Sequence, residues 1–156
     1  MYFAAHMPWL KWTCSDRSEH HTTLRARLQV AELKNLDGPV ELDVTGKWPV
    51  TDADAVFSAN TAHIMPWPAV EMMFAGAERL LAAGGRMVLY GPFHYGNAPT
   101  SAGNAAFDRE LAARGGGEGI RDIQAVEQLA AQHQLQLLAD FAMPANNRLL
   151  AWEKHA

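Results

Sequence analysis

Short apolar segments alternate with longer segments of helical periodicity along most of the chain, and this alternation restricts the possible folds strongly. We expect strands at residues 10–15, 40–44, 53–58, 86–90, 135–141 and 148–153. Between them, helices are expected at residues 17–33, from 70 to the glycines at 84 and 85, at 105–114 and at 122–133. Loops are expected at residues 35–38, 91–103 and 115–119, where Gly, Pro and Asn gather.

Strands and helices that alternate in this way favour a doubly wound, Rossmann-like α/β sheet, mainly parallel and with helices on both faces. The last two strands are separated by only a few residues, which predicts a C-terminal antiparallel hairpin. Ligands of such sheets bind beyond the carboxyl ends of the strands. Asp16, Asp43 and Asn60 are each expected at such a strand end.

The chain has 156 residues, which predicts a single domain over residues 1–156. Its net charge of -4 and the lack of a basic cluster argue against nucleic acid as a partner. No apolar stretch is long enough to span a bilayer, so we expect no membrane partner and a cytoplasmic location. Cys14 is the only cysteine, which excludes an internal disulfide and a thiolate zinc cluster, and no other metal-ligand spacing is present.

Several strings in the sequence are far more specific than a single glycine pattern. They are SDRSEH, LDVTGKWP, DAVFSANTAHIMPW, LLAAGGRMVLYGPFHYG, GIRDIQAVEQLA and MPANNRLLAWEK. Over essentially the whole chain, they resemble the domain of unknown function 938 family, also called methyltransferase-like 26. The resemblance implies a class I methyltransferase fold with S-adenosylmethionine (SAM) as its cofactor.

Members of that family normally begin with a strand, a G-x-G-x-G turn and a helix that ends in a string similar to MYFAAHMP at residues 1–8. The resemblance therefore implies an N-terminally truncated domain that lacks the first strand, the glycine loop and most of the first helix. A GTG valine codon inside the gene, if read as the start codon, would produce such a chain. Loss of the glycine loop would then weaken or abolish the activity of this chain.

The resemblance also implies roles for single residues. Asp16, with Arg17 beside it, would bind the cofactor ribose, or Asp16 would simply cap the following helix. Asp43 would lie near the adenine with Val44 packed on the base, or it would only shape a turn. Asn60 and Thr61 would contact the methionine part of SAM, although Asn is also common in turns for backbone reasons.

His63 is the expected general base, because imidazole titrates near neutral pH, although a purely structural histidine is the more frequent case. Tyr95 is a second catalytic candidate, and it lies with His94 in a glycine-rich loop that could cover the acceptor. Loop polarity alone would also explain both residues. Arg121 and Asp122 either line the acceptor pocket or hold the C-terminal hairpin.

The expected function is methyl transfer from SAM to a small molecule or a protein side chain. The alternative is a non-catalytic protein that keeps the methyltransferase fold either as a scaffold or as a dimerising partner, for example in a homodimer. A nicotinamide-dependent oxidoreductase is disfavoured, because the sequence has no dinucleotide fingerprint.

Overall fold

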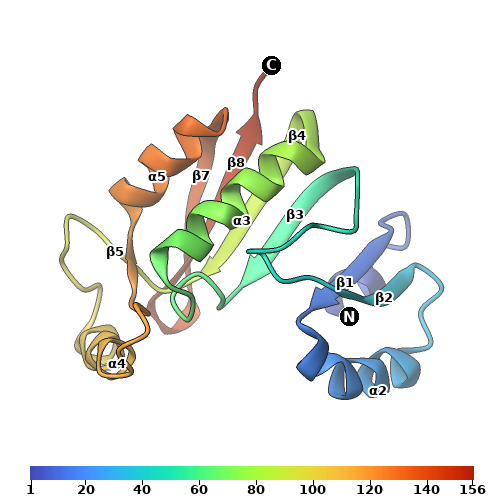
Figure 1. Ribbon diagram of the computed structural model, residues 1–156, viewed down its shortest axis with the longest axis horizontal. Coiled ribbons are helices and arrows are strands. Elements are labelled where there is room, and N and C mark those ends of the chain that lie inside the picture. Colours follow the sequence, from blue (N-terminus) through green and yellow to red (C-terminus); the bar gives the residue numbers. More distant parts are fainter. The chain divides into compact units, whose positions relative to one another are not determined.

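The computed structural model describes residues 1–156, which form two compact units, Met1–Pro49 and Val50–Ala156 (Figure 1). The prediction of one domain over the whole chain stays a prediction, and each unit is described by itself. None of the helices combines the length and the apolar character that crossing a bilayer requires.

Unit 1 has two parallel strands and three short helices. In chain order these are α1 (Tyr2–His6), β1 (Trp12–Asp16), the 3-10 helix η1 (Ser18–His20), α2 (His21–Ala31) and β2 (Leu36–Glu41). The parallel register pairs Asp16 with Glu41, so both strands end at the same edge. The expected strand, helix and strand are confirmed in type and order.

The predicted break at residues 35–38 and the strand at 40–44 were wrong in their bounds, because β2 already begins at Leu36 and ends at Glu41. Gly38 lies inside this strand with φ of +115°, where a Cβ would clash with the carbonyl oxygen of Cys14. The pairing of β1 with β2 shifts by one residue at this point. The glycine therefore marks a bulge within a strand, which the sequence pattern had suggested was a loop.

Unit 2 contains a four-stranded sheet in the order β3-β4-β8-β7. Its elements are β3 (Ala53–Ala59), α3 (Trp67–Leu80), β4 (Leu81–Gly91), β5 (Phe93–His94), α4 (Ala102–Ala112), β6 (Arg121–Asp122), α5 (Ile123–Gln132), β7 (Leu135–Met143), η2 (Pro144–Asn146) and β8 (Asn147–Lys154). β3 runs parallel to β4, whereas β8 is antiparallel to both β4 and β7, which confirms the predicted hairpin.

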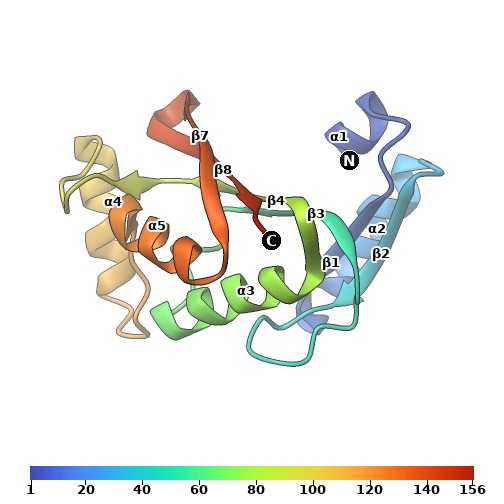
Figure 2. The ribbon, with the colours of Figure 1, turned by 90° about the horizontal axis from the view of Figure 1, so that it is seen from above.

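Helices α3 and α5 lie side by side on one face of this sheet (Figure 2). Phe74 of α3 is fully buried and contacts Trp152 of β8 edge to face, with ring centroids 5.8 Å apart. Val70, Met87 and Leu150 are fully buried as well. Burial of each such side chain contributes about 1.5–3 kcal/mol, so this layer stabilises the sheet of unit 2.

The predicted end of the third helix at Gly84 and Gly85 was wrong, because α3 ends at Leu80. The ammonium group of Lys154 donates hydrogen bonds to the carbonyl oxygens of Glu78 at 2.5 Å and Leu81 at 2.8 Å. A cation at the C-terminal end of a helix satisfies its free carbonyls and its dipole. The glycine pair instead lies in an irregular part of β4, where Gly84 has φ of +82°.

Candidate functional site

Asn60 and Thr61 begin the loop between β3 and α3, directly beyond the carboxyl end of β3. The Asn60 N–H donates to the carbonyl oxygen of Tyr90 at 2.7 Å, and this ties the loop to the end of β4. Asn60 has φ of +56°, a left-handed conformation that Asn adopts more readily than most residues. The hydroxyl of Thr61 donates to the carbonyl oxygen of Ala59. The left-handed backbone conformation therefore accounts for an Asn at this position, as the alternative predicted. The side chain of Asn60 is exposed.

Asn60 and His63 converge on Gly91, the last residue of β4. A Cβ added to Gly91 would lie 3.5 Å from His63 Nδ1 and 3.6 Å from Asn60 Oδ1. The missing side chain of Gly91 thus leaves a small cradle between two polar groups at the carboxyl ends of two parallel strands. Sheets of this type bind ligands at this edge.

His63 is 6% exposed, and its ring packs edge-on against Phe107 of α4 with centroids 5.4 Å apart. No hydrogen bond joins its imidazole to another residue. Burial lowers the pKa of His63 below its ordinary value of 6.5, and the positive charges of Arg121 and Arg114 lower it further. The imidazole is therefore neutral at physiological pH and able to accept a proton.

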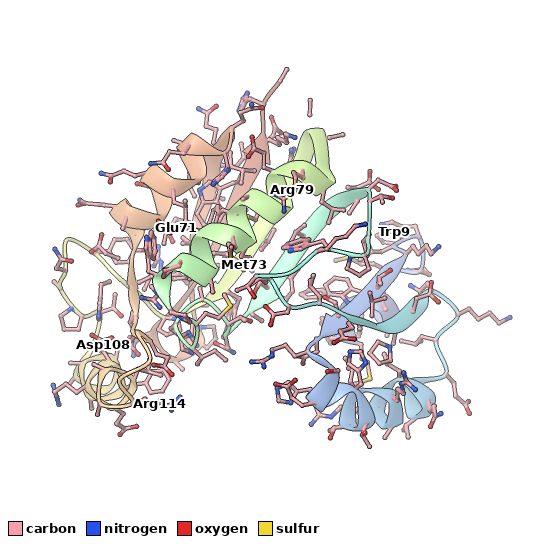
Figure 3. The ribbon with its side chains drawn as sticks, viewed as in Figure 1. Trp9, Glu71, Met73, Arg79, Asp108 and Arg114 are labelled. Atoms are coloured by element: carbon pink, nitrogen blue, oxygen red, sulfur yellow. The ribbon has the colours of Figure 1, made fainter.

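His94 lies in β5 and is buried, not in an open loop as predicted. Its Nε2 lies 3.1 Å from Asp108 Oδ2, and the other oxygen of Asp108 accepts from the N–H of Ile120 at 2.6 Å. Asp108 on α4 and Arg114 just beyond it lie at the same end of unit 2 (Figure 3). His94 and Asp108 also line a cavity of about 470 Å³.

The Tyr95 hydroxyl donates to Asp140 of β7 at 2.5 Å, and the guanidinium of Arg148 lies 5.5 Å from the centre of its ring. Burial and this hydrogen bond raise the pKa of Tyr95 to about 12. A phenol with this pKa stays protonated at neutral pH, so this geometry gives Tyr95 no activity as a base. Its catalytic role stays a prediction.

In unit 1, Asp16 is the last residue of β1. One oxygen of its carboxylate accepts from the N–H of Arg17 at 2.8 Å, but it caps neither η1 nor α2. The alternative that Asp16 caps the following helix was therefore wrong. Its second oxygen makes no hydrogen bond within the protein and is available to a hydroxyl donor.

Asp43 follows β2 by two residues and faces the same strand edge as Asp16. Its Oδ1 accepts from both the N–H and the hydroxyl of Thr45, at 2.9 and 2.6 Å, and these bonds lower its pKa. Its Oδ2 lies 3.9 Å from Arg17 Nε. Asp43 thus shapes its own turn, as one alternative predicted, and Val44 beside it is half-buried. Binding of adenine by these two residues stays a prediction.

The structure therefore brings Asp16, Arg17 and Asp43 together in unit 1, and Asn60 and His63 together in unit 2. Sequence reasoning missed the contribution of Gly91, and it left Arg121 undecided between a pocket and a structural role. The position of Gly91 at the end of a predicted strand was the only available signal for its part in the site.

Comparison with protein families matches residues 1–154 to the family described as Protein of unknown function (DUF938). Among solved structures, the chain is similar to PigF with SAH, with 16% identity and a TM-score of 0.83 over 97% of this chain and 46% of that one. An O-methyltransferase family protein from Burkholderia thailandensis gives 13% identity and a TM-score of 0.85, over 98% and 46%. The structure of the LepI complex with SAM gives 16% identity and a TM-score of 0.82, over 99% and 39%.

The chain spans less than half the length of these solved structures. At these identities the likeness concerns the fold, which is the Rossmann-like fold of SAM-dependent methyltransferases. The family match, in contrast, covers nearly every residue. The chain therefore belongs to the DUF938 family and has a class I methyltransferase-like fold.

Proposed function

We propose that the chain is the cofactor-binding part of a SAM-dependent methyltransferase, in which His63 accepts a proton from the methyl acceptor. The observation that carries the proposal is the convergence of Asn60 Oδ1 and His63 Nδ1 on Gly91. This convergence lies at the carboxyl ends of two parallel strands, in a fold shared with proteins solved with SAH or SAM.

Each unit, taken by itself, carries groups that suit one part of the cofactor. A Cβ at Gly91 would already be in van der Waals contact with the polar atoms of His63 and Asn60, and the exposed Asn60 side chain offers a polar partner at this strand end. In unit 1, the free carboxylate oxygen of Asp16 suits the hydroxyls of a ribose, because a carboxylate accepts hydrogen bonds from both hydroxyls of a diol. When bound, SAM supplies an activated methyl group on its sulfonium.

In this proposal, the imidazole of His63 accepts the proton that the methyl acceptor loses. Its neutral imidazole has no hydrogen-bond partner in the protein, and packing against Phe107 restricts the tilt of the ring. A protonated acceptor, such as a hydroxyl or an ammonium group, would lose its proton to this ring as the nucleophile forms. Alignment of acceptor and methyl group contributes the larger part of catalysis, about 7–11 kcal/mol when the geometry is ideal.

Isothermal titration calorimetry with SAM tests cofactor binding. We expect the chain to bind SAM, and Asp16→Asn to weaken binding about tenfold or more, because the amide lacks the charge that strengthens the ribose bonds. Asp37→Asn is the matched control, since Asp37 is also exposed and lies on β2. Failure of the unaltered chain to bind SAM would overturn the proposal and favour the scaffold alternative.

Catalysis is tested with tritium-labelled SAM and a set of phenols and lysine peptides as acceptors. His63→Gln should lower methyl transfer by about 10²-fold or more if the imidazole is the base. SAM affinity should change little in this variant. Equal transfer rates in both proteins would exclude His63 as the base while leaving cofactor binding intact.

A further inference from the structure

A short segment, residues 117–121, is bonded to the loop that carries His63. The N–H of Gly119 donates to the carbonyl oxygen of His63 at 3.0 Å. The side chain of Arg121 donates from Nε to the carbonyl oxygen of Ala62 at 3.0 Å and from Nη2 to that of Met65. The carbonyls at positions 62, 63 and 65 are thus all bonded to the same segment.

Arg121 is the centre of this arrangement. Its Nη2 also donates to the carbonyl oxygen of Gly117 at 3.1 Å, and its guanidinium lies 5.8 Å from the ring centre of Trp67, the first residue of α3. One side chain therefore contacts its own segment, the His63 loop and the start of the next helix. Its backbone is fixed as well, because Arg121 begins β6 and pairs with Phe93 of β5.

The partners of Arg121 are backbone carbonyls, and it forms no ion pair with a carboxylate. Burial lowers the pKa of Arg121, while the nearby charges of Asp108 and Glu118 oppose this effect. A planar guanidinium presents several N–H groups at fixed angles, and a lysine ammonium does not reproduce this geometry. Arginine is thus the residue type that can hold carbonyls of two segments at once.

We propose that Arg121 is the positioning residue of His63, because its guanidinium holds the loop at residues 62–65 in the conformation that presents the imidazole beside Gly91. The importance of holding His63 beside Gly91 rests on the proposed function, in which His63 is the base. The arrangement of the loop does not depend on that function. Arg121 also places a positive charge near the imidazole, together with Arg114, which follows α4.

The test compares Arg121→Lys, Arg121→Gln and the control Arg114→Gln in the full 156-residue chain. NMR gives two readouts, the hydrogen exchange rate of the Gly119 amide and the titration midpoint of His63. We expect both Arg121 variants to exchange the Gly119 amide about tenfold or more faster, because they lose hydrogen bonds of the guanidinium fork. Arg114→Gln should leave this rate unchanged, since Arg114 bonds no carbonyl of the loop.

The titration midpoint of His63 reports the effect of the Arg121 charge, whereas the exchange rate of the Gly119 amide reports the geometry of the loop. Arg121→Gln should raise the His63 midpoint because it removes a neighbouring positive charge, and Arg121→Lys should raise it less. An unchanged Gly119 exchange rate in both Arg121 variants would overturn the proposal, and so would an unchanged His63 midpoint in Arg121→Gln. Should Arg121→Gln fail to fold, Arg121→Lys alone decides through the exchange rate. Absence of SAM binding by the unaltered chain would refute the proposed function without changing either NMR result.

Discussion

Tyr95 donates its hydroxyl hydrogen to Asp140 at 2.5 Å, which joins the segment after β5 to strand β7. The same carboxylate accepts from Arg148 Nε at 2.7 Å through its other oxygen. Tyr95→Phe should therefore lower the free energy of unfolding by about 1 kcal/mol, a value reduced from that of a buried charged hydrogen bond because Tyr95 is partly exposed. Urea unfolding measures this change.

Alkaline titration tests the same contact. The pKa of Tyr95 is raised to about 12 in the folded state, against 10 for an ordinary tyrosine, so this residue favours folding below pH 10. That contribution is lost as the pH rises from 10 towards 12. Absorbance at alkaline pH should show a late tyrosine ionisation that Tyr95→Phe removes. The control Tyr2→Phe should retain it, and its disappearance there would contradict the assignment.

His63 makes the stability of unit 2 depend on pH in the opposite direction. Because its pKa is lowered in the folded state, the unfolded chain binds a proton more readily. The contribution of His63 is fully present above pH 6.5 and is lost as the pH falls from there towards the folded pKa. Unfolding free energies of the wild type and His63→Gln should differ in their slopes between pH 7 and 5. Parallel slopes would show that His63 is not shielded from water.

Two substitutions of Asn60 separate the effect of its left-handed backbone conformation on stability from the effect of its side chain on SAM binding. Asn60→Gly keeps the left-handed conformation at no steric cost, whereas Asn60→Ala strains it by about 1 kcal/mol or more. Both variants should weaken SAM binding if the side chain contacts the cofactor. Only Asn60→Ala should also lower the melting temperature. Calorimetric titration of SAM and thermal unfolding give the two quantities, and unchanged affinity in both variants would remove Asn60 from the site.

Lys154 should matter for stability although it is part of no predicted site. Lys154→Met keeps most of the aliphatic stem but removes both bonds to the C-terminal end of α3, which should cost about 2 kcal/mol. Lys47→Met is a suitable control because Lys47 is exposed. Chemical unfolding followed by circular dichroism compares the two variants, and an equal small loss in both would contradict the capping role.

Most strands and helices could be predicted because apolar residues form short runs in the strands and recur at helical spacing in the helices. The bounds of β3, α5, β7 and β8 lie within two residues of the expected ones, and the Asp122 carboxylate caps α5 by accepting from the N–H of Gln124, as expected. The end of α3 could not be predicted, because the group that satisfies its carbonyls lies more than 70 residues further along the chain.

The site was predictable only in part, for a similar reason. Asn60 follows β3 directly and His63 lies three residues later, so their place at a carboxyl edge follows from the order of elements. The side-chain partner of His94 is Asp108 on a later helix, and Arg121 binds carbonyls of a loop nearly 60 residues earlier. Backbone carbonyls carry no signal in the amino-acid sequence, so a side chain that binds them cannot be distinguished from one that lines a pocket.

Strand β8 lies between β4 and β7, although it follows both of them in the chain. On the ribosome, β3 and β4 can pair early, but β4 keeps one row of hydrogen-bonding groups open until β8 emerges. β7 also stays unpaired until β8 emerges, because its only partner in the sheet is β8. During translation, the edges of β4 and β7 that later pair with β8 are therefore open, and they invite association with other chains until β8 has emerged and completes the sheet.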